Sequence, residues 1–177
     1  MNTRFHFVSD RLALDFCNTA GSGFELLREP SDLQEWLVQA GGGAPKDVPC
    51  VEEFEEARAL RDELRPALLT GNTTRVAELV GAWLDPTMIR LCVDSDTLGT
   101  HPEPVGHSCR CVLVPIVLDA LAIARDYPDR VSECKSDSCP ALFLDLSRNR
   151  SRRWCSMEVC GSREKARAYY RRHRGDC

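Results

Sequence analysis

The 177-residue chain has no long uninterrupted apolar segment. Its longest apolar stretch, residues 112–124, is interrupted by Pro115 and Asp119 and is too short to cross a bilayer, so it is typical of a buried helix. The N-terminal residues also lack the basic start and the following apolar run of a signal peptide. We therefore expect a cytoplasmic protein that has no membrane partner.

Glycine and proline are not abundant either, with 11 and 10 residues. This content excludes a collagen-like fibre, and together with 43% hydrophobic residues it excludes a largely disordered chain. A chain of this length can bury a sizeable core as one medium domain, or as one domain followed by a small module.

Motifs for catalysis are missing as well. The glycines at 41–43 are not followed by the Lys-Ser/Thr pair of a phosphate-binding loop. No Ser/His/Asp order and no paired carboxylates stand out. We therefore do not expect an enzyme.

Positive charge is scarce in most of the chain and is concentrated near its end. The net charge is −4, yet residues 147–177 hold ten basic and three acidic side chains, whereas residues 1–146 carry a net charge of −11. Such a split predicts two modules with different partners. We expect an acidic domain over residues 1–129 and a basic module over residues 130–177, and only the second has the charge that nucleic acid attracts.

Apolar periodicity predicts a fold that is mainly α with minor β, of the α+β class. Helices are expected over 51–69, after a cap at Ser31, from Thr73 or Thr74 to Pro86, and from Val112 or Pro115 to about Tyr127. Short strands are expected at 4–8, 88–93 and 109–114, the last two joined by a loop at 99–106. Residues 11–18 fit either a strand or a short helix, and Trp36 and Trp83 are expected in the core.

Cysteine, in contrast, is abundant, with ten residues. Four of them form two Cys-x4-Cys pairs, Cys134 with Cys139 and Cys155 with Cys160, separated by 15 residues. Four thiolates close a tetrahedral site around Zn²⁺, and this arrangement of pairs is typical of zinc modules. Two disulfides, which the reducing cytosol disfavours, or four unrelated core cysteines are the alternatives. We predict one structural zinc ion, because four protein ligands leave no position for water or substrate.

The residues around these pairs predict a treble-clef-like zinc finger, made of a knuckle, a β-hairpin and a helix. Residues 142–146 alternate and are expected to pair with residues 152–156. Gly161 is expected to allow a close approach of the backbone to the metal, and Ser162 to cap a helix that runs to about residue 174. Because this module has few apolar residues of its own, zinc binding is expected to supply most of its folding free energy.

The predicted last helix carries a stripe of arginines. At 100° per residue, four of them fall within about 80° of arc: Arg163, Arg167, Arg171 and Arg174. The adjoining sector is expected to face inward and holds Ala166, Tyr169, Tyr170 and His173. Further candidate phosphate contacts are Lys165 and, on the hairpin, Arg148, Arg150, Arg152 and Arg153. Guanidinium groups suit phosphate oxygens, so DNA is the expected partner. A solvated basic face and docking onto the acidic domain are the alternatives.

The sequence of the basic module resembles the CGNR zinc-finger family. The resemblance lies in Phe143-Leu-Asp-Leu-Ser-Arg-Asn149, Arg152-Arg-Trp-Cys-Ser-Met157 and Cys160-Gly-Ser-Arg-Glu-Lys-Ala-Arg167. Residues 12–19, Leu-Ala-Leu-Asp-Phe-Cys-Asn-Thr, resemble the opening motif of the ABATE domain, which precedes that finger. Together these resemblances imply a bacterial transcription regulator that binds DNA. The family's Cys-Gly-Asn-Arg is Cys-Gly-Ser-Arg here, and Ser162 is as good a helix cap as asparagine.

Other residues suggest further partners. Asp15, Asn18 and Thr19 are candidates for a small-molecule effector pocket, with a turn and capping cluster as the alternative. His101, His107, Cys109 and Cys111 are candidates for a second metal site, with free buried thiols as the alternative.

A homodimer is expected because one small finger contacts little DNA. The runner-up function is a protein-interaction adaptor that does not bind DNA, and a third, RNA binding, requires Tyr169 or Tyr170 to face outward.

Overall fold

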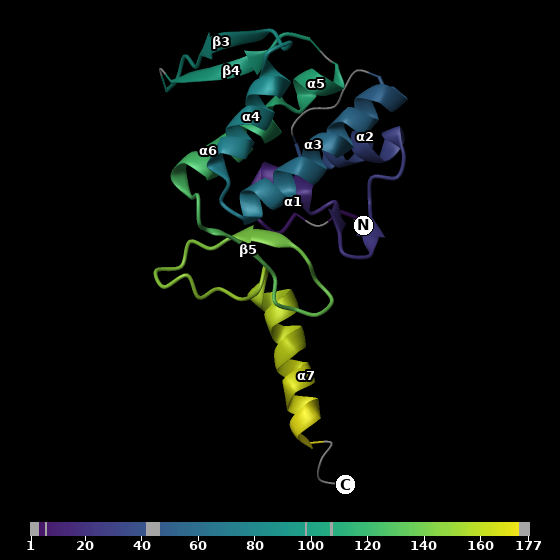
Figure 1. Cartoon of the computed structure of the whole chain (residues 1–177), viewed down its shortest axis with the longest axis vertical. Helices are drawn as coiled ribbons and strands as arrows, with labels where there is room; N and C mark the ends of the chain where they lie inside the picture. The colour runs from purple at the N-terminus through teal and green to yellow at the C-terminus, as the bar shows by residue number, and fades with distance from the viewer. Residues whose placement is uncertain (1–3, 6, 42–46, 98, 107, 174–177) are drawn as a thin grey trace.

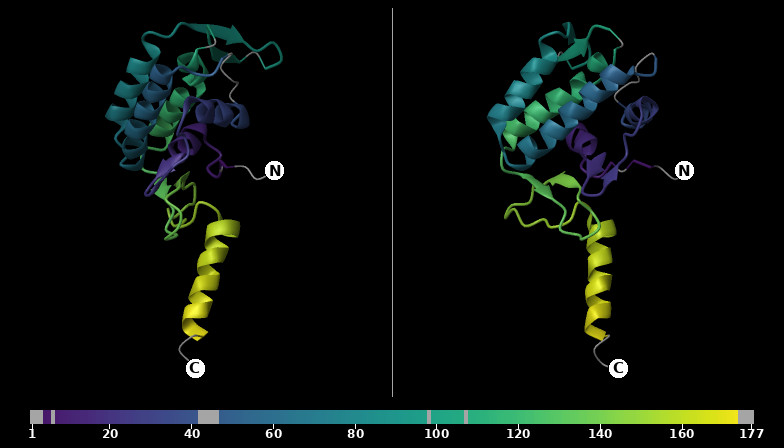
Figure 2. Two further views of the ribbon diagram at one scale, coloured as in Figure 1. Left: turned by 90° about the vertical axis from the view of Figure 1, so that its right-hand side faces the viewer. Right: turned by 45° about the vertical axis from the view of Figure 1, so that its right-hand side comes forward.

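The computed structural model describes residues 4–5, 7–41, 47–97, 99–106 and 108–173. It consists of a helical body and a narrower C-terminal end (Figure 1). A β-hairpin lies at one end of the body, and the last helix projects from the opposite end (Figures 1 and 2). Among the described helices, none has both the length and the apolar character needed to cross a membrane.

The body contains helices α1 (Leu12–Cys17), α2 (Pro30–Gln39), α3 (Val51–Leu69), α4 (Thr73–Leu84), α5 (Cys109–Val112) and α6 (Val114–Asp126). The strands form antiparallel pairs: β1 (Ala20–Gly21) with β2 (Phe24–Glu25), β3 (Ile89–Val93) with β4 (Thr100–Pro104), and β5 (Val131–Glu133) with β6 (Leu142–Leu144). A short π-helical turn, η1 (Met157–Gly161), leads into the last helix, α7 (Ser162–His173). The predicted class, mainly α with minor β, is confirmed.

The core of the body forms between α1, α3, α4 and α6, which pack against one another. The predicted helix over residues 51–69 has these bounds in the structure, and Pro66 lies within its last turn. Trp36 and Trp83 are 1% and 6% exposed, as predicted for core residues. Residues 11–18 contain helix α1, in which Ala13 through Cys17 are all buried. A helix buried on every side has no polar face to mark its period, which is why the sequence fitted either a strand or a short helix here.

Two helix starts differ from the prediction. Glu29, not Ser31, is the N-cap of α2, and its carboxylate forms a capping box with Asp32. Asn72, not a threonine, caps α4, with its Oδ1 accepting the N–H of Arg75 at 3.0 Å. Both segments hold several capping residues in succession, so composition alone cannot choose among them.

The strand predicted at residues 109–114 is wrong. The segment is helical, because Ser108 Oγ caps α5 by accepting the Cys111 N–H. The partner of β3 is instead β4, which was predicted to be a loop and pairs with β3 from Ile89↔Pro104 to Val93↔Thr100. Proline is tolerated on an edge strand, and both strands of this isolated hairpin are edges. The described part of residues 4–8 also forms no strand, since the Val8 N–H bonds to the Asp15 carboxylate.

The hairpin predicted between residues 142–146 and 152–156 is also wrong. Strand β6 pairs with β5, before the first cysteine, and not with the later segment. All three residues of β6 are buried, and Val131, Leu142 and Leu144 belong to the main core of the body. The hairpin therefore forms because it completes the body's core, a long-range effect that local alternation does not encode.

The C-terminal segment is joined to the body by specific hydrogen bonds. The Asn18 side chain donates to the Leu142 carbonyl at 2.9 Å and accepts the Leu142 N–H at 2.7 Å. The Arg65 guanidinium, from α3, donates to the Pro140 carbonyl and forms an ion pair with Glu133 at 2.9 Å. A Cβ on Gly21 would lie 2.6 Å from Pro140 Cγ, so only glycine allows the β1–β2 turn to approach this closely.

Candidate metal centre and basic helix

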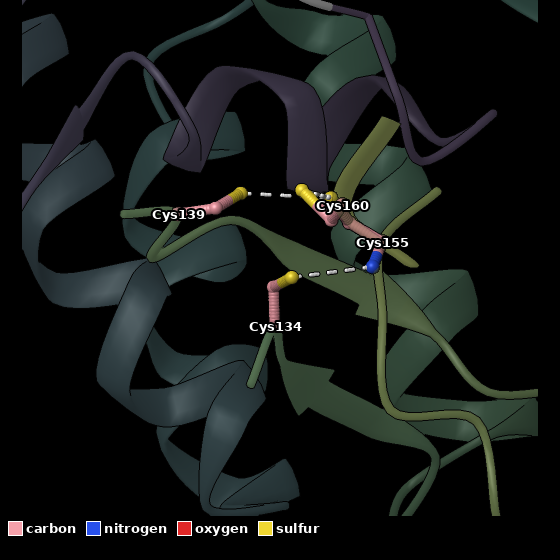
Figure 3. A group of neighbouring side chains, drawn as sticks. All are labelled: Cys134, Cys139, Cys155 and Cys160. Atoms are coloured by element: carbon pink, nitrogen blue, oxygen red, sulfur yellow. Dashed lines mark hydrogen bonds between the residues drawn. The ribbon is translucent and has the colours of Figure 1, made fainter. Parts of the chain in front are cut away.

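The four cysteines of the two Cys-x4-Cys pairs lie together. Their Sγ atoms are all within 4.8 Å of one another. The sulfur of Cys155 is 3.6 Å from that of Cys139 and 3.6 Å from that of Cys160, and the Cys155 N–H donates to Cys134 Sγ at 3.4 Å. Figure 3 shows the side chains pointing toward one another from separate segments of the chain.

These distances fit a zinc ion. A tetrahedron with Zn–S bonds of about 2.3 Å has sulfur–sulfur edges of about 3.8 Å. A disulfide would bring two sulfurs to about 2.05 Å, which is far shorter than the separations observed. The cysteines are free thiols in the structure, so the disulfide alternative does not describe them. The group of Cys134, Cys139, Cys155 and Cys160 can hold one zinc ion.

Burial and crowding act against thiolates at Cys155 and Cys160 in the metal-free cluster. Burial, together with the neighbouring Cys139, raises the pKa of the Cys155 thiol well above its ordinary value. Burial also raises the pKa of Cys160 to about 11. Thiolates this close repel one another, and a dication offsets that repulsion. Four sulfur ligands complete the coordination, so a bound zinc ion here would hold the fold together and perform no catalysis.

The local backbone explains how the ligands converge. Cys134 follows β5, and the 134–139 knuckle returns the chain to β6; the Cys139 N–H donates to the Ser136 carbonyl within it. Cys155 lies beside the knuckle, because the Lys135 N–H donates to the Arg153 carbonyl at 2.9 Å. Cys160 belongs to the turn that starts the last helix.

The start of that helix differs from the prediction. Ser156, not Ser162, is the cap, and its Oγ accepts the Val159 N–H at 3.2 Å. Ser162 lies inside the helical run and donates to the Met157 carbonyl. A Cβ on Gly161 would meet the side chains of Met157 and Trp154, so this glycine makes room for protein atoms. Because Cys155 and Cys160 flank residues 156–159, their spacing suggests a ligand loop there and does not indicate that a helical turn begins after Ser156.

Helix α7 is exposed on all sides. None of its described residues is buried, and Tyr169 and Tyr170 are 53% and 67% exposed. The predicted inward face is therefore wrong. The helix extends away from the body, and only its first turns contact the knuckle in the described part of the chain (Figures 1 and 2). Tyr169 stacks on His173 with ring centroids 4.0 Å apart, so the aromatic side chains pack along the helix itself.

The predicted arginine stripe lies on this helix. Arg163, Arg167 and Arg171 are exposed, as is Lys165, and Arg174 lies outside the described residues. The first turns are tied to the knuckle: Arg163 donates to Ser138 Oγ at 3.2 Å and the Ser136 hydroxyl donates to Glu164 at 2.9 Å. The Ser136 hydroxyl and the nearby Arg167 hold the pKa of Glu164 below its usual range. The zinc knuckle thus fixes the direction in which the helix points.

The four arginines of the loop after β6, at positions 148, 150, 152 and 153, are all exposed and differ in their hydrogen bonds. Arg148, Arg150 and Arg153 extend into solvent, with Arg150 at a φ of +49° in a tight loop. The buried Asp145 organises that loop by accepting the N–H groups of Ser147 at 2.8 Å and Arg152 at 3.0 Å. The guanidinium of Arg152, in contrast, donates to the carbonyls of Leu144, Trp154 and Cys155. Three of its five N–H donors therefore bond to the finger's own backbone, which the sequence did not indicate.

The candidate effector residues hold backbone or buried groups. Asp15 accepts the N–H groups of Val8 and Ser9, and Asn18 pairs with Leu142. Thr19 donates to the Phe16 carbonyl and accepts from the buried Arg61. Asn18 lines a cavity between the body and the finger.

The second candidate metal site is not brought together by the described residues. Cys109 and Cys111 lie in α5, His101 lies in β4, and His107 is outside the described residues. Within the described ranges, the single group of cysteines, histidines and carboxylates able to hold a metal is the four-cysteine cluster.

Comparison with known families agrees with this architecture. The model of the CGNR zinc finger matches residues 130–173. The model of the ABATE family, described as "Putative stress-induced transcription regulator", matches residues 10–127, about two thirds of the chain. A search of curated proteins finds no match. The chain therefore belongs to the ABATE family, and its ABATE domain is followed by a CGNR zinc finger.

Proposed function

We propose that the protein is a DNA-binding transcription regulator whose helix α7 contacts the phosphates and enters a groove of the duplex. One observation carries the proposal: the zinc knuckle holds out a basic helix that buries none of its described residues. A helix whose described residues all remain unburied has most of its surface available to another molecule. Within α7, five basic residues stand against one acidic residue.

The dimensions of α7 suit duplex DNA. Its 12 residues correspond to about 18 Å of length, and a helix with its side chains is about 10–12 Å wide. The major groove is about 12 Å wide and admits one α-helix. Arg148, Arg150 and Arg153, in the loop that follows β6, are further candidates for contacts with the DNA backbone.

The phosphate contacts that we propose are Arg163, Lys165, Arg167 and Arg171 on the helix and Arg174 after it. In the loop that follows β6 we propose Arg148, Arg150 and Arg153. Arg152 is assigned to support the loop. A single helix buries little DNA surface, so we propose that a homodimer places two helices on the duplex. This function belongs in the bacterial cytoplasm, where the DNA is.

The separation of charges also bears on the alternatives. The basic helix points away from the acidic body (Figure 2), so this arrangement does not support docking of α7 onto the body. An adaptor would use the same exposed basic surface to bind an acidic protein. The experiment must therefore compare a duplex with an acidic protein of similar charge density.

The test is fluorescence anisotropy with the zinc-loaded protein and a labelled random duplex at two salt concentrations. If about four phosphates are contacted, log K should fall against log[salt] with a slope near −3.6. Arg167→Ala combined with Arg171→Ala should flatten the slope by about 1.8. The matched control is Arg75→Ala with Arg125→Ala, which removes two arginines of the body that are paired with acidic neighbours.

Equal losses in the two double variants would overturn the role of α7, because binding would then follow net charge alone. No binding at low salt would overturn DNA as the partner. Competition by an acidic protein that equals competition by unlabelled duplex would favour the adaptor.

A further inference from the structure

The β3–β4 hairpin leaves one of its two edges open. The hairpin lies at the end of the body opposite α7, and in Figure 1 its strand β3 lies at the outer end of the molecule. Within the described part of the chain, β3 pairs with β4 and with no other strand. A free strand edge presents a row of N–H and C=O groups, and such a row is a template for pairing with another chain.

The hydrogen bonds at the two ends of the hairpin show which residues face the free edge of β3. The Val105 N–H donates to the Met88 carbonyl, and the Asp94 N–H donates to the Gly99 carbonyl, both at 2.8 Å. Backbone groups alternate in direction along a strand, so the even-numbered residues of β3 direct their N–H and C=O groups toward β4. The odd-numbered residues of β3 therefore direct theirs outward.

The outer edge of β4 is closed, in contrast. By the same alternation its outward N–H positions are residues 100, 102 and 104, and Pro102 and Pro104 have no N–H to offer. Proline on an edge strand is one of the devices by which proteins prevent pairing with another chain. Strand β3 contains no proline. The hairpin is thus protected at β4 and open at β3.

The side chains of β3 separate into an apolar face and a polar face. Leu91 and Val93 share the apolar face and are 69% and 66% exposed. Arg90 and Cys92 share the polar face, where both contact Glu103 of β4: the guanidinium forms an ion pair at 2.9 Å and the thiol donates at 3.0 Å. A strand whose apolar side chains are in water gains burial when another strand is added beside it.

The charges of β3 favour a second copy of the chain as that added strand. In an antiparallel two-fold pair, outward residues must oppose outward residues, so the registers that overlap at least three residues of β3 have their axis at Arg90, Leu91 or Cys92. An axis at Arg90 places two arginines opposite each other, which is destabilising. An axis at Leu91 gives Arg90 no acidic partner across the pair. An axis at Cys92 places Arg90 opposite the partner's Asp94 and Leu91 opposite the partner's Val93.

From this arrangement we infer that two copies of the chain dimerise by antiparallel pairing of β3 with β3, about a two-fold axis at Cys92. The two hairpins would then form one four-stranded sheet, with Leu91 and Val93 on its apolar face and Arg90 and Asp94 paired on its polar face. Because α7 lies at the opposite end of each body, both basic helices stay uncovered (Figures 1 and 2). The inference rests on the proposed function only in taking the dimer as the functional form.

The experiment is sedimentation equilibrium of the full-length zinc-loaded protein from micromolar to millimolar concentration. We expect a monomer–dimer equilibrium that Leu91→Pro weakens at least about ten-fold, since each copy loses an N–H that donates to the other. The hairpin itself should persist, because this N–H points away from β4. Thr100→Pro is the matched control: it also removes an outward N–H of the same hairpin, but at the edge of β4, and should leave the dimer unchanged. Circular dichroism shows that each variant remains folded.

A thiol crosslink tests the register. A two-fold axis at Cys92 brings the two Cys92 Cα atoms to about 4.5 Å, within the range of about 4.4–6.8 Å for a disulfide. An axis at Leu91 separates them by about 7–8 Å. Diamide, which accepts the two electrons and two protons that the thiols lose, should therefore link the copies. The background is Cys50→Ser with Cys177→Ser, since Cys17, Cys109 and Cys111 are buried. Adding Cys92→Ser should abolish the link and leave the dimer.

A protein that stays monomeric at every concentration would overturn the inference and would leave the edge of β3 to a strand of another protein. Equal dimer affinities in Leu91→Pro and Thr100→Pro would overturn the interface, and a dimer without the Cys92 link would overturn the register. Dimerisation through β3 without DNA binding would refute the proposed function and leave this inference standing. DNA binding by a protein that stays monomeric would do the reverse.

Discussion

The side-chain amide of Asn18 pairs with both backbone groups of Leu142, at 2.9 Å and 2.7 Å, and so joins the end of α1 to the first strand after the zinc knuckle. The amide acts here as a substitute for a neighbouring strand, because it donates and accepts as a peptide group does. Leu142 itself is fully buried. The finger's hairpin therefore depends on the body for its hydrogen bonds as well as for its core.

Asn18→Ala should lower the free energy of unfolding by about 2–3 kcal/mol, because it leaves the N–H and C=O of a buried residue without partners. Urea denaturation followed by circular dichroism measures this loss. Asn149→Ala, which alters an exposed asparagine, is the control and should change little. A loss below about 0.5 kcal/mol for Asn18→Ala would show that water satisfies these groups.

Cys139→Ser should reduce the zinc content and loosen the knuckle and α7, since the zinc would hold these parts together. Strands β5 and β6 should persist, because Val131, Leu142 and Leu144 are packed in the body's core. Elemental analysis gives the zinc content, and limited proteolysis should show new cuts in the 134–139 knuckle and after residue 144, with none inside β5 or β6. Cys92→Ser, which alters a cysteine outside the cluster, is the control. Unchanged zinc stoichiometry in Cys139→Ser would refute the metal assignment.

Glu25→Gln should destabilise the body by about 2–3 kcal/mol. Arg61 is 1% exposed and donates to both carboxylate oxygens of Glu25 at 2.7 Å, so the change removes most of the compensation of a buried cation. Asp62, at 2.8 Å, and Thr19 remain as partners, which keeps the loss below that of an isolated buried charge. Thermal and urea unfolding measure the difference.

The same pair predicts a dependence on pH. Burial alone would raise the pKa of Glu25, but the Arg61 guanidinium holds it below its usual range. The folded state thus binds the proton less tightly than the unfolded state does. The stability difference between native protein and Glu25→Gln should be full above about pH 4.3 and should shrink as the pH falls through the lowered pKa. A difference that stays constant down to pH 2 would contradict the role of the charge.

Arg152→Ala should weaken the finger and not its proposed DNA contacts. Its guanidinium donates to three backbone carbonyls and lies 4.7 Å from the centre of the Phe143 ring. We expect faster transfer of zinc to a chelator, measured with a metallochromic dye. The combined Arg148→Ala and Arg150→Ala variant should show the opposite division, with weaker DNA binding and an unchanged rate of zinc transfer. Identical behaviour of the two variants would contradict the separate roles proposed for Arg152 and for the other arginines of this loop.

The sequence determined the features that depend on local pattern. The span of α3 follows from apolar periodicity over 19 residues, and the helix formed with those bounds. The zinc site follows from ligand type and spacing, because two short pairs of cysteines can converge on one ion through many backbone paths. The positive charge of the last helix also needs no structure to be recognised.

Only the tertiary structure decided how those parts are joined. The partner of β6 proved to be β5, because Leu142 and Leu144 complete a core formed by distant helices, and local alternation carries no information about that core. The inward face predicted for Tyr169 and Tyr170 failed because none of the described residues of α7 is buried against the rest of the described chain. The contacts of Asn18, Arg152 and Arg163 depend on which carbonyls and hydroxyls lie within reach in the folded chain. The Asn18–Leu142 pair joins segments 124 residues apart, and spacing along the chain does not contain that distance.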